Sequence, residues 1–240
     1  MKRALLFDLD GTLLPVDTYA FVEESLKIMA RELAQVIPPD RFIAAIWKGV
    51  EEVVANRDEN LTNEQVFLGT FLSQTGLKKE EILPEVERFY NQVFPTLGHL
   101  CQPTPLAKQI VEEAQRQGYV LVVATNPLYP RQAIWARMAW AGVDHIPFAL
   151  VTTYENCYFA KPHLAYYEQI CQSIGIAPQQ CIMVGNDMQE DMCATQLGMK
   201  TFLVTDWLID RGHPRYRPDD EGTLAQLYER LCQKVGVFAC

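Results

Sequence analysis

The amino-acid sequence predicts an α/β protein, a doubly wound parallel sheet with an inserted helical subdomain. Short apolar runs occur at the start of the chain and again after residue 100, where they alternate with helical patterns, as is typical of parallel strands buried on both faces. Residues 15–100 contain helical patterns and no convincing strand. We therefore expect a core of residues 1–14 and 101–240 and a helical subdomain of residues 15–100.

The first apolar run, Ala4–Phe7, ends in two acidic residues, Asp8 and Asp10. The two-residue period of a strand places both carboxylates on one side, where their repulsion disfavours ionising both. Such a pair indicates either a bound divalent cation or a division of labour in which one acid stays protonated. Gly11 then supplies a turn and Thr12 a hydroxyl.

The helical subdomain is predicted from apolar residues that recur at helical spacing and from start and stop signals. Asp17 or Thr18 can cap the first helix, and Thr62 with Gln65 has the pattern of a capping box for the third. Four helices are expected, over residues 17–33, 42–56, 62–76 and from Lys79 or Pro84 to Phe94.

After the Pro-rich residues 100–105, helices and strands alternate. The expected strands are residues 119–124, 148–151, 181–184 and 201–204, which makes five with Ala4–Phe7. The expected helices are residues 105–118, 130–141 and 164–174, one ending at Gly198, and 223–234. In sheets of this kind ligands bind at the carboxyl ends of the strands.

The polar residues that could do chemistry fall at those strand ends. They are Asp8, Asp10, Thr125, Asn126, Asp187 and Asp191, with Lys161 ahead of the helix that leads into the fourth strand. Carboxylates hold a hard cation, hydroxyl and amide groups bind phosphoryl oxygens, and a lysine neutralises charge that develops on transfer. Together these residues predict a metal and phosphate site.

The order of these motifs resembles the haloacid dehalogenase superfamily in its phosphatase branch, and the opening Asp8-Leu9-Asp10-Gly11-Thr12-Leu13 is the most specific part. The resemblance implies a Rossmann-like core and a helical cap of the C1 type inserted after the first strand. It also implies that Asp8 is the nucleophile that forms an aspartyl-phosphate. Asp10 would protonate the leaving oxygen and then activate the hydrolytic water.

The same resemblance implies the binding groups. Substrate-binding residues would be Thr12, Thr125, Asn126 and Lys161, the last also catalytic, and Mg²⁺ would be bound by Asp8, the Asp10 carbonyl and the acids after the fourth strand. That family often has an acid directly after the glycine, whereas here Asn186 follows Gly185. We assign Asp187 as the direct ligand, because a carboxylate suits Mg²⁺ better than an amide, and Asp191 as an outer residue.

The expected function is a Mg²⁺-dependent phosphatase acting on a small phosphorylated metabolite. Asp10 favours it, because an oxygen leaving group needs a proton. Two alternatives stay open: a phosphomutase of the same superfamily, which returns the phosphoryl group to a sugar, and a catalytically silent phosphate-binding protein. The chain is expected to act as a monomer or a homodimer.

Composition excludes several other classes. The net charge of −9 disfavours a nucleic-acid partner, and no apolar run approaches the roughly 20 residues of a membrane span. The apolar run after Lys2 and Arg3 breaks at Asp8, so we expect a cytoplasmic protein without an export signal. Seven cysteines without a C-x-x-C pair predict mostly buried free thiols.

Aromatic residues of the helical subdomain have two interpretations. Packing between helices is favoured over a substrate cage for Phe89, Tyr90 and Phe94. For Trp47 and Lys48, contact with a substrate is considered but not favoured. His99 is the only histidine close to the expected return from the subdomain to the core.

Overall fold

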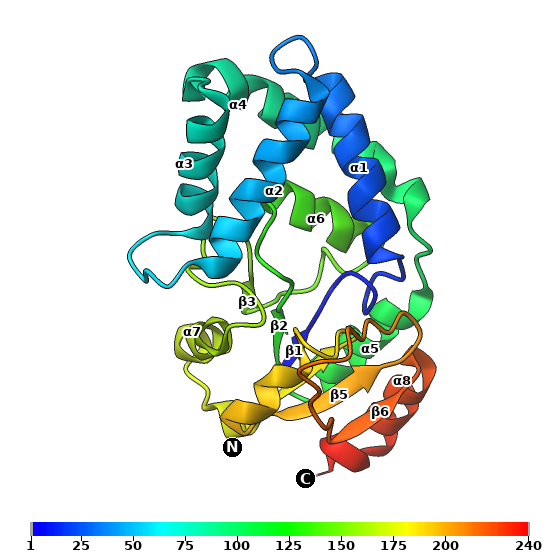
Figure 1. Cartoon of the computed structure of the whole chain (residues 1–240). Helices are drawn as coiled ribbons and strands as arrows, with labels where there is room; N and C mark the ends of the chain where they lie inside the picture. The colour runs from blue at the N-terminus through cyan, green and yellow to red at the C-terminus, as the bar shows by residue number, and fades with distance from the viewer. Residues whose placement is uncertain (1, 240) are drawn as a thin grey trace.

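The computed structural model describes residues 2–239 and contains a six-stranded sheet (Figure 1). Its strands are β1 Ala4–Phe7, β2 Val120–Val123, β3 Leu150–Val151, β4 Cys181–Gly185, β5 Lys200–Val204 and β6 Asp220–Gly222. Their order is β3-β2-β1-β4-β5-β6, and every neighbouring pair is parallel. The predicted fold class is confirmed.

Helices cover both faces of this sheet because β1 has apolar side chains on each. Leu5 and Phe7 pack in one hydrophobic cluster with the helices α5 Pro105–Arg116, α6 Arg131–Trp140 and α8 Leu224–Gln233. Ala4 and Leu6 point to the other cluster, which contains α7 Leu164–Ile174 and part of a 3₁₀-helix, Met192–Leu197. The two-residue period of an extended strand produces this division.

Between β1 and α5 the described chain forms four α-helices that lie together on one side of the molecule (Figure 1). They are α1 Thr18–Glu32, α2 Pro39–Ala55, α3 Asn63–Thr75 and α4 Lys79–Arg88, followed by a π-helical turn Phe89–Val93 and a 3₁₀-helix Phe94–Leu100. Asp17 caps α1 by accepting from the Ala20 amide, and Thr62 and Gln65 form the predicted capping box.

Four local predictions differ from the structure in existence, type or extent. The strand β6 was missed because Asp220-Glu221-Gly222 has no apolar run, as suits a short edge strand. The element before Gly198 is a 3₁₀-helix, and β3 has only two residues. The fourth helix begins at Lys79, the first of its two expected starts, but it ends at Arg88, where the π-helical turn follows, and not at Phe94.

The start of α3 is hydrogen-bonded to the core. The buried Asn63 donates its amide to the Cys157 carbonyl at 2.8 Å and its side-chain nitrogen to Pro127 at 3.2 Å. The Glu64 amide reaches the Tyr154 carbonyl at 2.8 Å. The segment that contains α1–α4 is therefore joined to the core by hydrogen bonds at the start of α3 as well as by its two chain connections.

Two expectations from composition can be compared with the structure. The cysteines within residues 2–239 are free and all but Cys232 are buried, as predicted, while Cys240 lies outside the described residues. None of the helices in the described part of the chain has both the length and the apolar character that a membrane span needs.

Candidate active site

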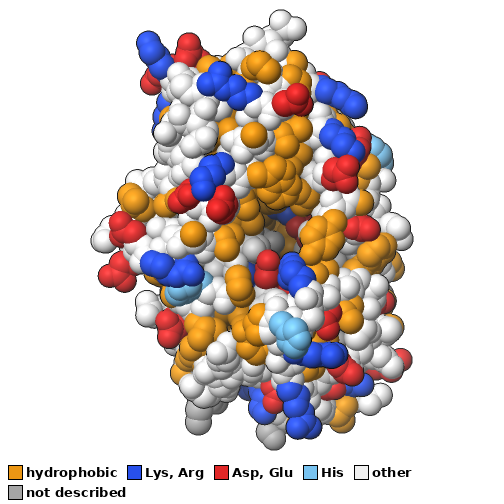
Figure 2. All heavy atoms as spheres, viewed as in Figure 1, with side chains coloured by type: hydrophobic (Ala, Val, Ile, Leu, Met, Phe, Trp, Pro, Cys, Tyr) orange, Lys and Arg blue, Asp and Glu red, His pale blue; other side chains and the backbone are white. Residues whose placement is uncertain are grey.

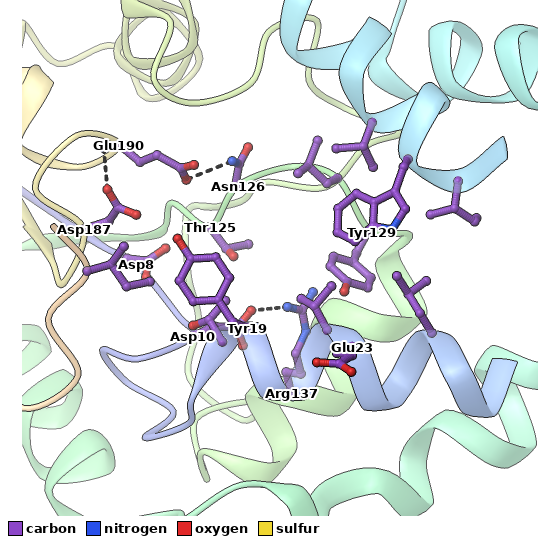
Figure 3. A pocket seen from close by; sticks show the side chains of 18 of the residues that line it. Asp8, Asp10, Tyr19, Glu23, Thr125, Asn126, Tyr129, Arg137, Asp187 and Glu190 are labelled. Atoms are coloured by element: carbon purple, nitrogen blue, oxygen red, sulfur yellow. Dashed lines mark hydrogen bonds and ion pairs between the residues drawn. The ribbon is translucent and has the colours of Figure 1, made fainter. Parts of the chain in front are cut away.

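A cavity of about 600 Å³ lies between the carboxyl ends of the strands and the helices α1–α3 (Figure 3). Six of the eight predicted site residues line it: Asp8, Asp10, Thr125, Asn126, Asp187 and Asp191. The other two, Thr12 and Lys161, are buried directly against Asp8. The fold thus brings together residues that are up to 183 positions apart in the chain.

Lys161 joins two of the predicted acids. Its side chain is 1% exposed, and its Nζ donates to Asp8 Oδ1 at 2.9 Å and to Asp191 Oδ1 at 2.6 Å. Burial alone would lower the pKa of Lys161, but the carboxylates of Asp191 and Asp8 raise it well above its usual value. The ammonium group therefore stays charged and fixes the direction of the Asp8 carboxylate.

The loop after β1 is packed against Asn186. Thr12 Oγ1 lies 3.4 Å from Asp8 Oδ2 and 3.2 Å from Asn186 Oδ1, either of which can accept its proton. Asn186 Nδ2 donates to the Trp207 carbonyl at 2.6 Å. A Cβ on Gly11, which has φ +80°, would collide with the Asn186 amide, so the turn requires glycine.

Asp187 and Asp191 have different surroundings. Asp191 is fully buried and accepts the Asp187 amide with Oδ2 at 3.0 Å, so it links Lys161 to the loop after β4. Asp187 accepts the Gln189 and Glu190 amides at 2.9 and 2.8 Å. Arg211 also binds both oxygens of Asp187, Nη1 to Oδ1 at 2.9 Å and Nη2 to Oδ2 at 2.8 Å.

Asp10 is paired with a residue that the sequence analysis missed. Arg137, in the last turn of α6, is 1% exposed and forms an ion pair with Asp10 Oδ2. Its Nε donates to the Ala133 carbonyl at 3.2 Å, and its guanidinium lies 4.3 Å from the centre of the Tyr129 ring. Burial raises the pKa of Asp10, and Arg137 opposes that rise. The sequence did contain a signal for this residue. Arg137 is one helical turn from Ala133 and adjacent to Met138, both core residues, which indicates a buried arginine.

Glu190 is the second residue that was missed. Its Oε2 accepts from Asn126 Nδ2 at 2.9 Å, and the Asn126 Oδ1 in turn accepts the Lys161 amide at 3.3 Å. Burial, and after it the nearby Asp187 carboxylate, raises the pKa of Glu190 to about 7.

Thr125, at the end of β2, is held in place through its main-chain carbonyl. This oxygen accepts hydrogen bonds from two buried hydroxyl groups, Thr152 Oγ1 at 2.7 Å and Tyr166 OH at 2.9 Å.

The charges at the strand ends fit a divalent cation. No three histidine, cysteine or acidic side chains within residues 2–239 already converge as a metal cluster. The carboxylates are those of Asp8, Asp10, Asp187, Glu190 and Asp191, and the cations are Lys161, Arg137 and Arg211. With every group ionised, two formal negative charges remain, which a Mg²⁺ ion would balance, and carboxylate oxygens are the ligands that it prefers.

The helices α1–α3 line the opposite end of the cavity. Trp47 is 51% exposed and lines the cavity, although the sequence did not favour its contact with a substrate, whereas Lys48 pairs with Glu52 at 2.8 Å. Phe89 and Phe94 are packed as predicted, while Tyr90 reaches the cavity wall. His99 is not among the lining residues.

Comparisons with known proteins agree with this geometry. The haloacid dehalogenase-like hydrolase family matches residues 2–206. A glyceraldehyde 3-phosphate phosphatase from Methanothermobacter thermautotrophicus is 26% identical over 218 residues, which cover 88% of each chain. A phosphoglycolate phosphatase from Haemophilus influenzae is 27% identical over 202 residues, which cover 83% of this chain and 84% of the relative.

Solved structures share the fold. A HAD phosphatase from Thermococcus onnurineus superposes with a TM-score of 0.57 at 24% identity and covers 96% of this chain and 98% of its own. A 2-haloacid dehalogenase from Pseudomonas syringae pv. tomato gives a TM-score of 0.64 at 22% identity, with coverages of 98% and 100%. With the family match over most of the chain, the predicted membership is confirmed: this enzyme belongs to the haloacid dehalogenase-like hydrolases.

Proposed function

We propose that this hydrolase is a Mg²⁺-dependent phosphatase that acts on a small phosphorylated metabolite through an aspartyl-phosphate on Asp8. The observation that carries the proposal is the contact of Lys161 Nζ with Asp8 Oδ1 at 2.9 Å. It holds the Asp8 carboxyl group at the end of β1, facing the cavity, with a second acid, Asp10, two residues away. The names of the phosphatase relatives support the same reaction class.

In the first step an Asp8 carboxylate oxygen bonds to phosphorus as the bond from phosphorus to the leaving oxygen breaks. Asp10 gives its proton to that leaving oxygen and then accepts a proton from the water that hydrolyses the aspartyl-phosphate. The buried Oδ1 of Asp10 has no partner within the described residues, which leaves it free for this exchange, while Oδ2 is held by Arg137. Arg137 acts here as a positioning residue.

The transferring phosphoryl group is bound by the groups around Asp8. Lys161 supplies positive charge, and the hydroxyl of Thr125 and the amide of Asn126 line the cavity beside it. Thr12 contributes through its hydroxyl contact with Asp8. These groups are held by buried partners before substrate arrives, which reduces the cost of organising them during transfer.

The Mg²⁺ ion would be held by Asp8, the main-chain carbonyl of Asp10 and Asp187, with Asp191 outside them. When bound, it supplies charge that neutralises the phosphoryl oxygens. Arg211 already binds the Asp187 carboxylate, so the metal competes with this guanidinium for the same oxygens. The contact of Asp191 with Lys161 supports its role as an orienting residue.

The helices of residues 15–100 act in this proposal as the cap over the phosphate site, and residues 1–14 and 101–240 as the core. Their position across the cavity from Asp8 supports that division. A cytoplasmic monomer or homodimer, without nucleic-acid or membrane partners, stays a prediction.

Hydrolysis of phenyl phosphate, measured with Mg²⁺ and again with EDTA, tests the proposal. A phosphatase releases phosphate with Mg²⁺ and stops with the chelator. A phosphomutase would release little, and a silent phosphate-binding protein none. Metal-independent hydrolysis at an undiminished rate would contradict the role of Mg²⁺.

A further inference from the structure

The two ends of the cavity differ in chemistry, and the cap end is apolar. The side chains that line it there include Val22, Leu26, Met29, Ile43, Ile46 and Trp47. Figure 2 shows hydrophobic side chains gathered above the hollow in this face, with acidic and basic side chains along its lower edge. From this arrangement we propose that the leaving group of the preferred substrate is an extended apolar chain or ring. The inference rests on the phosphatase function proposed above.

The cations of the cavity wall have partners already. Within residues 2–239 they are Lys27, Arg137 and Arg211. Lys27 Nζ pairs with Glu23 at 2.6 Å. Arg211 pairs with Asp187 and also lies 3.7 Å from Glu190, which remains beside it when a metal occupies Asp187. Arg137 pairs with Asp10, and its one nitrogen without a partner, Nη2, is buried from solvent.

A leaving group with a second negative charge is disfavoured by this wall. A carboxylate placed across the cavity from Asp8 would meet no unpaired, accessible cation among the described residues, and it would lie near Glu23. Bringing it in would cost desolvation without a compensating ion pair. Phosphoglycolate, which the name of one relative gives as its substrate and which carries a carboxylate, therefore fits this cap end poorly.

An apolar leaving group would bind favourably at the cap end, because binding buries apolar area there. Trp47 lines the cavity while 51% exposed, so a bound chain or ring can remove further apolar area from water. Each buried methylene is expected to improve binding roughly fourfold. This gain is independent of the chemistry at phosphorus, because it arises at the far end of the cavity.

The test is kcat/KM with Mg²⁺ for ethyl, butyl and hexyl phosphate, whose leaving groups have nearly equal basicity. The inference predicts a rise with chain length that approaches fourfold per methylene until the cavity is filled, and hexyl phosphate well above phosphoglycolate. Phenyl and naphthyl phosphate, compared in the same way, distinguish preference for a ring from preference for a chain. Equal values along the alkyl series, or a preference for phosphoglycolate, would overturn the inference.

Two tryptophan variants locate the effect. Trp47→Ala should reduce the hexyl-to-ethyl ratio of kcat/KM several-fold, because Trp47 lines the cap end. The control is Trp135→Ala: this side chain is 39% exposed on α6, packs on Arg131 and does not line the cavity, so the ratio should match wild type. Equal ratios in both variants would contradict the assignment. Failure of the proposed function is distinguishable, because no phosphate ester, phenyl phosphate included, would then be hydrolysed.

Discussion

The core end and the cap end of the cavity are built on different principles. At the core end, Asp8, Lys161 and Asp191 are buried and joined by hydrogen bonds, so each side chain has a fixed direction. At the cap end the wall is made by apolar side chains such as Leu26, Ile46 and Trp47, and Trp47 is 51% exposed. In the proposed function the reaction therefore depends on a rigid network, whereas substrate selection depends on the apolar area that binding buries. Substitutions should therefore be severe at one end and substrate-dependent at the other.

The largest effect is expected for Asp8→Asn. The amide is nearly isosteric but cannot act as the nucleophile, so detectable hydrolysis should disappear while the thermal unfolding transition is retained. Phosphate release under Mg²⁺ is the measurement, and Asp40→Asn, an exposed change on α2, is the control. Turnover of Asp8→Asn within about tenfold of wild type would be incompatible with covalent catalysis.

Asp10→Asn should produce a loss that depends on the leaving group. General acid catalysis contributes roughly 10²–10⁴-fold, and an alkoxide needs that proton far more than a nitrophenolate. We expect a large loss of kcat with ethyl phosphate and a much smaller one with nitrophenyl phosphate. Equal losses on both esters would argue against Asp10 as the proton donor.

Removing the buried cation at the core end should destabilise the fold. Arg137→Met leaves the Asp10 side chain, which is only 15% exposed, without its partner, which should lower the free energy of unfolding by up to about 3–5 kcal/mol. Urea denaturation measures this loss. In the double variant with Asp10→Asn the loss should be smaller than the sum of the two single losses, because both partners are gone.

A matched control is available for that experiment. Arg116 also lies in the last turn of its helix, but it pairs with Glu113 on the surface, so Arg116→Met should change stability little. If Arg137→Met proved as stable as Arg116→Met, the buried pair would have no structural importance.

Smaller effects are expected at the proposed metal site. Asp187→Ala should weaken the activation by Mg²⁺ the most, and Asp191→Ala should cost about 10–100-fold, as changes outside the ligands commonly do. Asn186→Ala should cost less than Asp187→Ala, since its side chain binds Thr12 and Trp207. Titrating Mg²⁺ against activity compares the three variants. If Asn186→Ala were the most damaging, the metal ligand would be one position earlier.

The strands of the sheet and the acidic residues at their ends could be predicted from the sequence, because the patterns that indicate them are local. The apolar run Ala4–Phe7 and the acids that follow it identify a strand end directly, and parallel strands bring such ends together. The partners of these acids could not be predicted in the same way. Arg137 reaches Asp10 from 127 residues away, and Arg211 reaches Asp187 from a loop 24 residues later. No local pattern encodes such pairs.

The cap end was the least predictable part. A helical pattern indicates which residues are apolar, but it does not distinguish a face that packs on a neighbouring helix from one that borders a cavity. Phe89 and Phe94 pack against neighbouring residues, whereas Trp47 and Tyr90 border the cavity. All four are aromatic residues in helical segments, so the pattern alone does not separate them. The strand β6 was also missed for lack of a sequence signal. Its three residues pair with β5 through the backbone, and none of them is a large apolar residue.

The most direct test of the covalent mechanism is acid quenching during turnover, followed by mass spectrometry of the peptide that contains Asp8. The Asp10→Asn variant with nitrophenyl phosphate and Mg²⁺ suits it, because the loss of the base should slow hydrolysis of the intermediate more than its formation. Asp8→Asn is the blank. The account predicts one phosphoryl group on Asp8 that appears while substrate is present and disappears when it is exhausted. Continued turnover with Asp8 unmodified, or with the phosphoryl group on another residue, would contradict it.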